Sequence, residues 1–313
     1  MQIEGTALVT GGAGFLGSHL VDELVARGTP VVVVDSLDAG SRDNLAASAA
    51  SARFIEADVR DRSWWPQLGA SRIDTVFHYA ANASVPRSTS DPLYDLTTNI
   101  QGTFNMLELA REHGAKFVFI SSAAVYGSPQ YLPTDEGHPT QPISNYGASK
   151  LAGELYVNLY RENHGLDTRT VRYFNCYGPR QPRYIVFDFL KKAELPGSTF
   201  EVLGTGQQIR TQLFVQDAVK ATLLVADRGD HLPYNIGSER TFSVIDLAEA
   251  VLEAVGRTDV RRVPTGTSWV GDIQTLQPSV ERLKKLGFVE EYTLTDGLKE
   301  VLIWWRKRSE SQS

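Results

Sequence analysis

The fold of this chain follows from one glycine-rich segment, Thr10-Gly11-Gly12-Ala13-Gly14-Phe15-Leu16-Gly17. It follows a short apolar run at residues 6–10 and precedes apolar residues at helical spacing. Glycines between a strand and a helix permit a tight turn and let backbone N–H groups approach a pyrophosphate at the positive end of the helix dipole. The alternative is a glycine-rich turn with a purely structural role. Neighbouring residues have to distinguish the two interpretations.

Those neighbours favour a dinucleotide. Asp35 ends a run of four valines, 18 residues after Gly17. A carboxylate at about this spacing accepts hydrogen bonds from the adenosine ribose and repels a 2′-phosphate, which predicts NAD rather than NADP. Asp58 follows the third expected strand, where adenine contacts are expected, with a turn or cap residue as the alternative.

Strand and helix patterns alternate through the first half of the chain. Beyond 6–10 and 31–34, we expect strands at 53–56, 75–78, 117–121 and 170–173, and helical stretches near 93–113 and 145–164. Such alternation predicts an α/β fold with a doubly wound parallel sheet. After Phe174 prolines and glycines interrupt the pattern, and the chain is expected to return to the main sheet near 213–226 and 235–237. We therefore predict a dinucleotide-binding domain at 1–174 plus about 211–237, and a smaller substrate-binding region at 175–210 and 238–313.

Composition excludes several classes of protein. The chain has 313 residues, with 31 Lys or Arg against 37 Asp or Glu, a net charge of −6, and 42% hydrophobic residues. This apolar content excludes wholesale disorder, and an acidic chain lacks the basic surface that nucleic-acid binding needs. No apolar run reaches the ~18 residues of a membrane span.

The expected location is the cytoplasm. Cys176 is the single cysteine, which excludes an internal disulfide, and the N-terminus has no basic, apolar leader pattern. The histidines show no metal-ligand spacing, so no metal site is predicted.

Tyr146 and Lys150 lie four residues apart, on one face of an expected helix. A nearby ammonium and the cationic ring of oxidised nicotinamide both favour a phenolate, which makes Tyr146 a candidate proton shuttle. Ser122 follows an expected strand whose carboxyl end faces the ligand crevice of such a sheet. An incidental surface pair is the alternative for Tyr146 and Lys150, and Ser121 is the alternative to Ser122. Asn99, in an expected helix, is either a contact near the cofactor or a solvent-facing amide.

Six motifs, in this order, resemble the extended short-chain dehydrogenase/reductase family, and most of all its nucleotide-sugar 4-epimerases of the UDP-glucose 4-epimerase type. The resemblance runs from about Thr6 to Trp305. The motifs are Thr-Gly-Gly-Ala-Gly-Phe-Leu-Gly (10–17), Asp-Val-Arg-Asp (58–61), His-Tyr-Ala-Ala (78–81), Ser-Ser-Ala-Ala-Val-Tyr-Gly (121–127), Tyr-Gly-Ala-Ser-Lys (146–150) and Arg-Tyr-Phe-Asn-Cys-Tyr-Gly-Pro-Arg (172–180).

The resemblance implies a Rossmann domain that holds NAD, a C-terminal region that closes over an NDP-sugar, and a homodimer formed by the helices near 93–113 and 145–164. Carried over by position, the catalytic residues are Ser122, Tyr146 and Lys150. The implied cofactor-binding residues are Gly11, Gly14, Phe15, Leu16, Gly17, Asp35, Asp58, Val59, Ala80, Asn99, Tyr146 and Lys150. The implied substrate-binding residues are Ser84, Val85, Ser122, Asn175, Arg183, Arg210 and Asp272.

The positions after Ser122 favour one reaction of this family. Related dehydratases carry an Asp-Glu pair there and related UDP-glucuronate decarboxylases a glutamate, whereas this chain has Ala123 and Ala124. The resemblance therefore implies 4-epimerisation of a UDP-hexose or UDP-hexuronate through a transient 4-keto sugar. A dehydratase or 4-keto-sugar reductase is the alternative, and a non-catalytic NAD-binding regulator a remote one.

The chain departs from the family pattern where the substrate diphosphate would bind. Trp269 replaces an arginine of the family, and Arg210-Thr211-Gln212 replaces Arg-Asp-Phe. Other basic residues are candidates to compensate, and one in the 180–192 loop is a candidate to pair with a uronic acid carboxylate. These candidates are Arg87, Arg180, Arg183, Lys191 and Lys192.

Overall fold

The computed structural model describes residue 3, residues 5–266, residue 275 and residues 277–310. Its centre is a seven-stranded parallel sheet in the order β11-β6-β5-β4-β1-β2-β3. This order confirms the predicted doubly wound α/β fold, with the reversal of strand order between β1 and β4. The strands are β1 (Ala7–Thr10), β2 (Val31–Asp35), β3 (Ala52–Glu56), β4 (Thr75–His78), β5 (Lys116–Ser122), β6 (Thr168–Tyr173) and β11 (Tyr234–Ile236).

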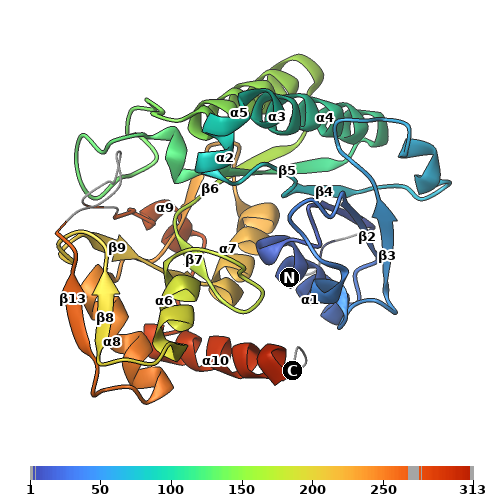
Figure 1. The fold of residues 1–313 in the computed structure, drawn as a ribbon. Coiled ribbons are helices and arrows are strands. Elements are labelled where there is room, and N and C mark those ends of the chain that lie inside the picture. Colours follow the sequence, from blue (N-terminus) through green and yellow to red (C-terminus); the bar gives the residue numbers. More distant parts are fainter. Residues whose placement is uncertain (1–2, 4, 267–274, 276, 311–313) are drawn as a thin grey trace.

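Helices cover both faces of the sheet (Figure 1). On one face lie α4 (Gly102–His113) and α5 (Asn145–His164), and on the other α1 (Phe15–Ala26) and α7 (Val215–Arg228). Neighbouring strand residues point into opposite cores: Leu8 packs with Met106 and Val157, whereas Val9 packs with Leu20. Burial on both faces explains why these strands are continuous apolar runs rather than alternating ones.

The expected helical stretch near 93–113 is divided in three. It consists of α3 (Pro92–Leu96), the π-helical turn η3 (Thr97–Gln101) and α4. A π-turn widens the helix locally, and such turns are frequent at functional sites. The short elements that precede or follow strands of the sheet are α2 (Val85–Ser90), η1 (Arg42–Leu45), η2 (Trp65–Leu68) and η4 (Ala123–Val125).

Only one of the two segments expected to return to the main sheet supplies it with a strand. β11 joins the edge of the sheet beside β6, but β10 (Leu213–Phe214) pairs with β7 (Cys176–Tyr177) in a separate two-stranded sheet. The rest of the 213–226 segment is α7, because its apolar residues recur at helical spacing and pack against α1, β6 and β11.

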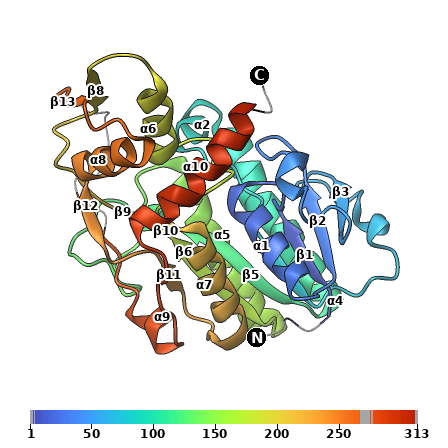
Figure 2. The same ribbon diagram turned by 90° about the horizontal axis from the view of Figure 1, so that it is seen from below.

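The remaining elements form a second layer beside the sheet, seen at the lower left in Figure 1 and from below in Figure 2. A third apolar cluster joins α6 (Ile185–Glu194), α8 (Val244–Val255) and α10 (Leu294–Glu310). The strands β9 (Ile209–Thr211) and β12 (Thr241–Ser243) pair antiparallel, β8 (Thr199–Val202) and β13 (Arg261–Pro264) pair parallel, and α9 (Glu281–Lys285) packs by β11. The domain boundaries expected from the sequence stay a prediction.

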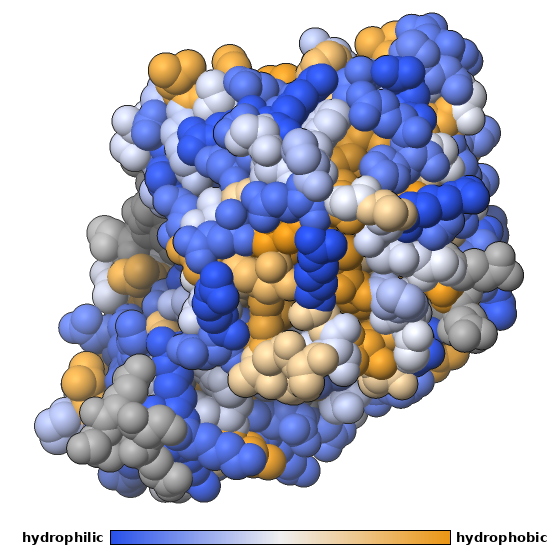
Figure 3. Space-filling model, turned by 90° about the vertical axis from the view of Figure 1, so that its right-hand side faces the viewer, coloured by the Kyte–Doolittle hydropathy of each residue, from blue (hydrophilic) through white to orange (hydrophobic). Residues whose placement is uncertain are grey.

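The opposite side of the molecule is the sheet edge formed by β3. Seen from this side, apolar side chains gather in a band across the middle of the face, flanked by hydrophilic ones (Figure 3). β3 itself exposes Arg53 and Glu56, and charged side chains on an edge strand disfavour pairing with another sheet. Within the described part of the chain, no helix has the length and apolar character to cross a membrane.

Candidate active site

The glycine-rich turn connects β1 to α1 at the point where strand order reverses. Gly11 has φ of 68°, and a Cβ added to it would lie 2.6 Å from the backbone nitrogen of Ala80, which follows β4. A Cβ on Gly17 would lie 2.3 Å from the carbonyl oxygen of Gly11. Only glycine fits either position, so the structure brings Gly11, Gly17 and Ala80 together as the sequence predicted.

The first turn of α1 offers backbone N–H groups beside this turn. Gly14 is the N-cap, and no described side chain caps the helix there. Phe15 and Leu16 are its first residues, and their side chains pack into the apolar clusters while their backbone lies at the helix N-terminus. Uncapped N–H groups at the positive end of a helix dipole fit a pyrophosphate.

Asp35 lies at the end of β2 and faces the turn. Its Oδ2 accepts a hydrogen bond from the backbone N–H of Ala13 at 2.9 Å, and its Oδ1 accepts one from Leu37 at 2.8 Å. Burial raises the pKa of this carboxyl above its usual value, while the two backbone donors lower it. Each carboxylate oxygen has a further lone pair, so Asp35 can also accept hydrogen bonds from ribose hydroxyls.

Asp58 and Val59 follow β3. Asp58 Oδ1 accepts from the backbone N–H of Arg60, and its Oδ2 accepts from the Arg60 guanidinium at 2.9 Å. The turn-residue alternative is therefore realised, and the adenine contact stays a prediction. Val59 is buried, and its carbonyl accepts a hydrogen bond from Asn105 at 2.9 Å, which fixes this segment against α4.

Ser122 and Tyr146 meet where β5 ends and α5 begins. The Ser144 hydroxyl caps α5 by accepting from the Gly147 N–H at 3.1 Å, which places Tyr146 in the first turn. Burial raises the pKa of the Tyr146 phenol to about 12, whereas its hydrogen bond with Ser122 and the charge of Arg183 lower that pKa. The acidification expected from neighbouring cations is therefore outweighed by burial in the protein alone.

Lys150 lies one helical turn beyond Tyr146 and is buried. Its side chain passes over the Phe119 ring, with Nζ 5.0 Å from the ring centroid. Burial lowers the pKa of the ammonium to about 8, while the negative charges of Asp95 and Glu154 raise it.

Asn99 lies in η3 and is buried, so the solvent-facing alternative is wrong. Its Oδ1 accepts from the backbone N–H of Asn82 at 2.8 Å, and its Nδ2 donates to Asp95 and to the Ser149 hydroxyl at 3.1 and 2.9 Å. The side chain thus joins η3 to α5 beside Lys150. A direct contact with the cofactor stays a prediction.

The substrate-binding residues implied by the resemblance come from separate elements. Ser84 caps α2 by accepting from the Arg87 N–H, Val85 begins that helix and is 44% exposed, and Asn175 follows β6. Arg210 lies in β9, where its guanidinium donates to the carbonyl of Ile209. Asp272 and Trp269 lie outside the described residues.

The loop after β7 reaches across to the segment that contains Ser84. The Tyr184 hydroxyl donates to the carbonyl of Ala83 at 2.9 Å, and Tyr184 has φ of 80°, a strained value for a residue with a side chain. Arg183 lies over the Tyr184 ring at 5.2 Å, and both residues influence the pKa of Tyr146. The loop therefore places the charge of Arg183 close enough to act on the Tyr146 phenol, a neighbour that the sequence alone did not predict.

Most of the basic residues proposed to compensate for the missing arginine are engaged elsewhere. Arg180 pairs with Asp22 at 2.6 Å and Arg87 with Asp38 at 2.5 Å. Lys192 donates to the carbonyl of Glu201. Lys191 lies over the Phe187 ring, and Arg183 has no ion-pair partner within the described ranges.

Sequence reasoning missed the side chains that surround these groups. Asp38 accepts from both Arg87 and Tyr94, and Asp95 accepts from Asn82 and Asn99. These residues belong to no spaced motif, and apart from Asn99, which is four residues from Asp95, their partners lie 13 to 56 residues away in the chain. Only the fold brings them to the site.

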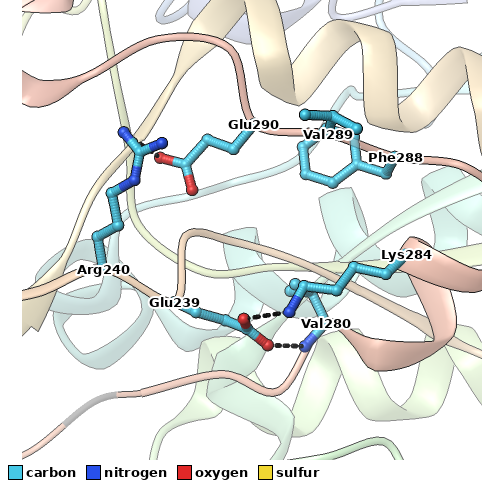
Figure 4. Close-up of a pocket in the computed structure, with 7 residues that line it drawn as sticks. All are labelled: Glu239, Arg240, Val280, Lys284, Phe288, Val289 and Glu290. Atoms are coloured by element: carbon cyan, nitrogen blue, oxygen red, sulfur yellow. Dashed lines mark hydrogen bonds and ion pairs between the residues drawn. The ribbon is translucent and has the colours of Figure 1, made fainter.

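A separate pocket of about 450 Å³ lies in the C-terminal region (Figure 4). Its charged lining residues face one another in two pairs, Lys284 with Glu239 at 2.5 Å and Arg240 with Glu290 at 3.7 Å. None of the predicted site residues that the structure describes lines it, and its charges are mutually balanced. We therefore do not assign the substrate diphosphate to this pocket.

Comparisons with known proteins agree with this geometry. A profile of the NAD dependent epimerase/dehydratase family matches residues 7–237. A putative UDP-glucose 4-epimerase of Methanocaldococcus jannaschii is 34% identical over 96% of this chain and 99% of its own length.

Two solved structures are similar over nearly their whole length. UDP-glucose 4-epimerase of Thermotoga maritima, solved with UDP-glucose, has a TM-score of 0.90 and 35% identity, covering 97% of this chain and 99% of that one. A dTDP-glucose 4,6-dehydratase of Streptomyces venezuelae, solved with NAD bound, has a TM-score of 0.87 and 32% identity, covering 98% of each chain.

The cofactor of the family fits the residues present. The turn around Gly11 and Gly17 leaves no room for a Cβ, the N-terminus of α1 is uncapped among the described side chains, and Asp35 closes the turn. With this site at the reversal of strand order and a family profile over most of its length, the chain belongs to the NAD-dependent epimerase/dehydratase family of extended short-chain dehydrogenases/reductases and uses NAD.

Proposed function

We propose that this chain catalyses the 4-epimerisation of a nucleoside-diphosphate sugar, a UDP-hexose or a UDP-hexuronate. The observation that carries the proposal is the set Ser122, Tyr146 and Lys150. The two residues directly after Ser122 are Ala123 and Ala124 in η4. A proton can move at one hydroxyl of the substrate, but the positions after Ser122 offer no acid or base for elimination of water. Relatives named for UDP-glucose 4-epimerase activity support the same reaction class.

In this proposal Tyr146 Oη accepts the proton of the sugar 4-hydroxyl, and Ser122 holds that hydroxyl in line with the phenol. Lys150 supplies a positive charge that stabilises the phenolate once formed. Bound NAD would supply the hydride acceptor for C4 and the hydride donor for its return. Because the redox change cancels, the protein has to retain both the 4-keto sugar and the dinucleotide through each turnover.

Arg183 supports the hexuronate as one of the two substrate classes. It lies beside Tyr146, and within the described ranges no carboxylate pairs with its guanidinium. C6 is bonded to C5, the neighbour of the carbon whose hydroxyl meets Tyr146. A carboxylate at C6 would therefore lie near this cation, and such pairs are charge-assisted.

A 4,6-dehydratase is the second candidate. The Streptomyces venezuelae dehydratase shares the fold over the whole chain, and a dTDP-glucose 4,6-dehydratase of Streptomyces griseus is 37% identical over 96% of this chain. If this chain were a dehydratase, the acid and base for the elimination of water would have to come from residues other than Ala123 and Ala124.

One NMR experiment separates these reactions. The purified protein is incubated with UDP-glucose, UDP-N-acetylglucosamine, UDP-glucuronate and dTDP-glucose in turn, and the sugar products are identified. We expect a pair of C4 epimers at equilibrium with no net NADH. A 4-keto-6-deoxy sugar or stoichiometric NADH would contradict the proposal, and absence of turnover with intact NAD binding would favour a regulatory protein.

We also propose a homodimer formed by α4 and α5, in the cytoplasm. Large apolar side chains on the outer side of these helices are exposed, among them Phe104, Leu155, Tyr156 and Leu159. A contiguous apolar surface of this kind on two packed helices is typical of a protein–protein interface. The location rests on the single cysteine and awaits cell fractionation.

A further inference from the structure

The ammonium of Lys150 is buried, and no carboxylate that the structure describes is in contact with it. The residue is 3% exposed, and within the part of the chain that is described no carboxylate forms an ion pair with it. A buried ammonium next to an aromatic ring loses its proton more readily than one in water. Something else has to keep this group charged if the proposed reaction depends on it.

Asp95 is a buried carboxylate that could balance this positive charge. It lies in the last turn of α3 and is 1% exposed, and its Oδ1 accepts hydrogen bonds from Asn82 Nδ2 at 2.7 Å and Asn99 Nδ2 at 3.1 Å. Both donors are neutral amides, and no basic side chain among the described residues pairs with the carboxylate. A buried carboxylate without a cation is costly unless a positive charge lies near by.

The two residues belong to one packed unit. The same Asn99 Nδ2 that donates to Asp95 also donates to the hydroxyl of Ser149, the residue before Lys150. α3 and η3 both pack against α5. The negative charge of Asp95 raises the pKa of Lys150 and is the largest favourable influence on it.

We propose that Asp95 is a positioning residue for the reaction, which supplies the counter-charge of Lys150 and holds it through Asn99 and Ser149. The inference rests on the proposed function, since Lys150 has to be charged only if Tyr146 shuttles a proton. It assigns a role to a residue outside the Ser–Tyr–Lys set.

The other charged groups around Lys150 do not replace Asp95. Glu154 on α5 also raises the pKa of Lys150, but by less than Asp95 does, and both its oxygens are bound by Arg172 of β6. His78 of β4 has a pKa lowered to about 3, by burial and by the charge of Lys150, so it stays neutral. Several other charged residues on the packed elements pair elsewhere, among them Arg87 of α2 with Asp38, Glu108 of α4 with Arg111, and Lys116 of β5 with Asp167.

The sign of the effect follows from the charges. Without the carboxylate, the Lys150 ammonium loses its proton at lower pH, and the Tyr146 phenol, whose pKa Asp95 also raises, ionises at lower pH. The reaction needs a charged lysine and an ionised phenol, so both limbs of the pH–activity profile should move toward lower pH.

Asp95→Asn tests this, because it removes the charge and keeps the shape and an amide oxygen for Asn82 and Asn99. Asp91→Asn is the matched control: it makes the same change at the exposed N-cap of α3, a position where asparagine caps equally well. Asp95→Ser, smaller and neutral, repeats the test should the amide not be accommodated, and Asp95→Glu restores the charge.

The readout is competitive labelling of Lys150 with acetic anhydride as a function of pH, followed by mass spectrometry of the peptide. In Asp95→Asn or Asp95→Ser we expect the labelling midpoint to fall by about one pH unit, with no shift in Asp91→Asn and with partial recovery in Asp95→Glu. An unchanged midpoint in both neutral variants, or equal shifts in Asp95→Asn and Asp91→Asn, would overturn the proposal.

Labelling needs no substrate, so it remains decisive if no NDP-sugar is turned over. Where the protein does epimerise a sugar, the kcat profile of Asp95→Asn should shift in the same direction as the labelling midpoint. Epimerisation with unshifted labelling would refute the role of Asp95 and leave the proposed function standing. Shifted labelling without turnover of any sugar would support the effect of Asp95 on Lys150 and contradict the proposed function.

Discussion

At the scale of single residues, the phenol of Tyr146 lies in the first turn of α5, within hydrogen-bonding reach of Ser122. Burial raises its pKa to about 12, so the oxygen is protonated in the protein alone and needs a cation or a hydrogen bond to ionise. Ser122 provides the hydrogen bond and Arg183 a positive charge. In the proposed reaction this oxygen is the group on which turnover depends.

Tyr146→Phe should lower turnover by about 10²–10⁴-fold or more, because it removes the proton acceptor and keeps the ring. NAD released on denaturation should stay at the wild-type amount. The rate is measured by NMR of the sugar product. Tyr156→Phe, on the exposed side of the same helix, serves as the control and should leave the rate unchanged. Normal turnover in Tyr146→Phe would contradict the role assigned to the phenol.

We propose that Asp35 determines which dinucleotide is accepted. Its carboxylate shapes the turn through Ala13 and Leu37, and a 2′-phosphate placed near it would meet a negative charge. Asp35→Ser should narrow the preference for NAD over NADP by about tenfold or more, measured as the ratio of dissociation constants in calorimetry. Asp43→Ser, at an exposed position in η1, should leave that ratio unchanged. An unaltered ratio in Asp35→Ser would show that another group excludes NADP.

At the scale of elements, α5 is joined to the sheet by a buried ion pair. Glu154 accepts from Arg172 Nε at 2.9 Å and from Arg172 Nη2 at 2.6 Å, and it also accepts from Ser121, the neighbour of Ser122, at 2.6 Å. Both ion-pair side chains are less than a tenth exposed, at 7% for Arg172 and 5% for Glu154. The pair thus connects the helix of Tyr146 to the strand end that carries Ser122.

Glu154→Gln should lower the free energy of unfolding by about 3–5 kcal/mol, because it leaves the Arg172 charge buried and unpaired. Urea denaturation followed by circular dichroism measures the change. The control is Glu162→Gln, which breaks an exposed pair with Arg161 near the end of the same helix and should cost only about 0–1 kcal/mol. Equal losses in the two variants would mean that burial does not set the energy of this pair.

At the scale of the whole molecule, α4 and α5 pack on one face of the sheet (Figure 1), and large apolar side chains on them are exposed. Leu155 is 58% and Leu159 51% exposed, and Phe104 meets Tyr156 at 6.2 Å between ring centroids. Burying these side chains against a second copy would remove their apolar area from water, at about 25 cal/mol per Å².

The double variant Leu155→Asp/Leu159→Asp should sediment as a monomer at concentrations where the unaltered chain is a dimer. Analytical ultracentrifugation measures this directly. Leu203→Asp changes a leucine that is 50% exposed outside α4 and α5 and should leave the dimer intact. Dimers that survive the double variant would place the interface on another surface.

Local sequence patterns determined the frame of this molecule. The glycine turn after β1, the run of valines in β2 and the bounds of α5 follow from short-range steric and capping preferences: Ser144 caps the start of α5, and Gly165 ends it with left-handed backbone. The same preferences place Ser122, Tyr146 and Lys150 at the ends and faces of elements that the sequence already predicted.

Tertiary structure alone decided the electrostatics of the site and the breaks in its elements. No local pattern indicates that 93–113 is divided by a π-turn, that β10 pairs with β7 rather than with the main sheet, or that Asp95 lies beside Lys150. The bond from Asn99 to Ser149 joins residues 50 positions apart, and the pKa of a buried group depends on what the rest of the chain packs around it. Backbone preferences act over a few residues and can be predicted from the local sequence. Burial and the electrostatic effect of distant charges act through space and arise only once the chain has folded.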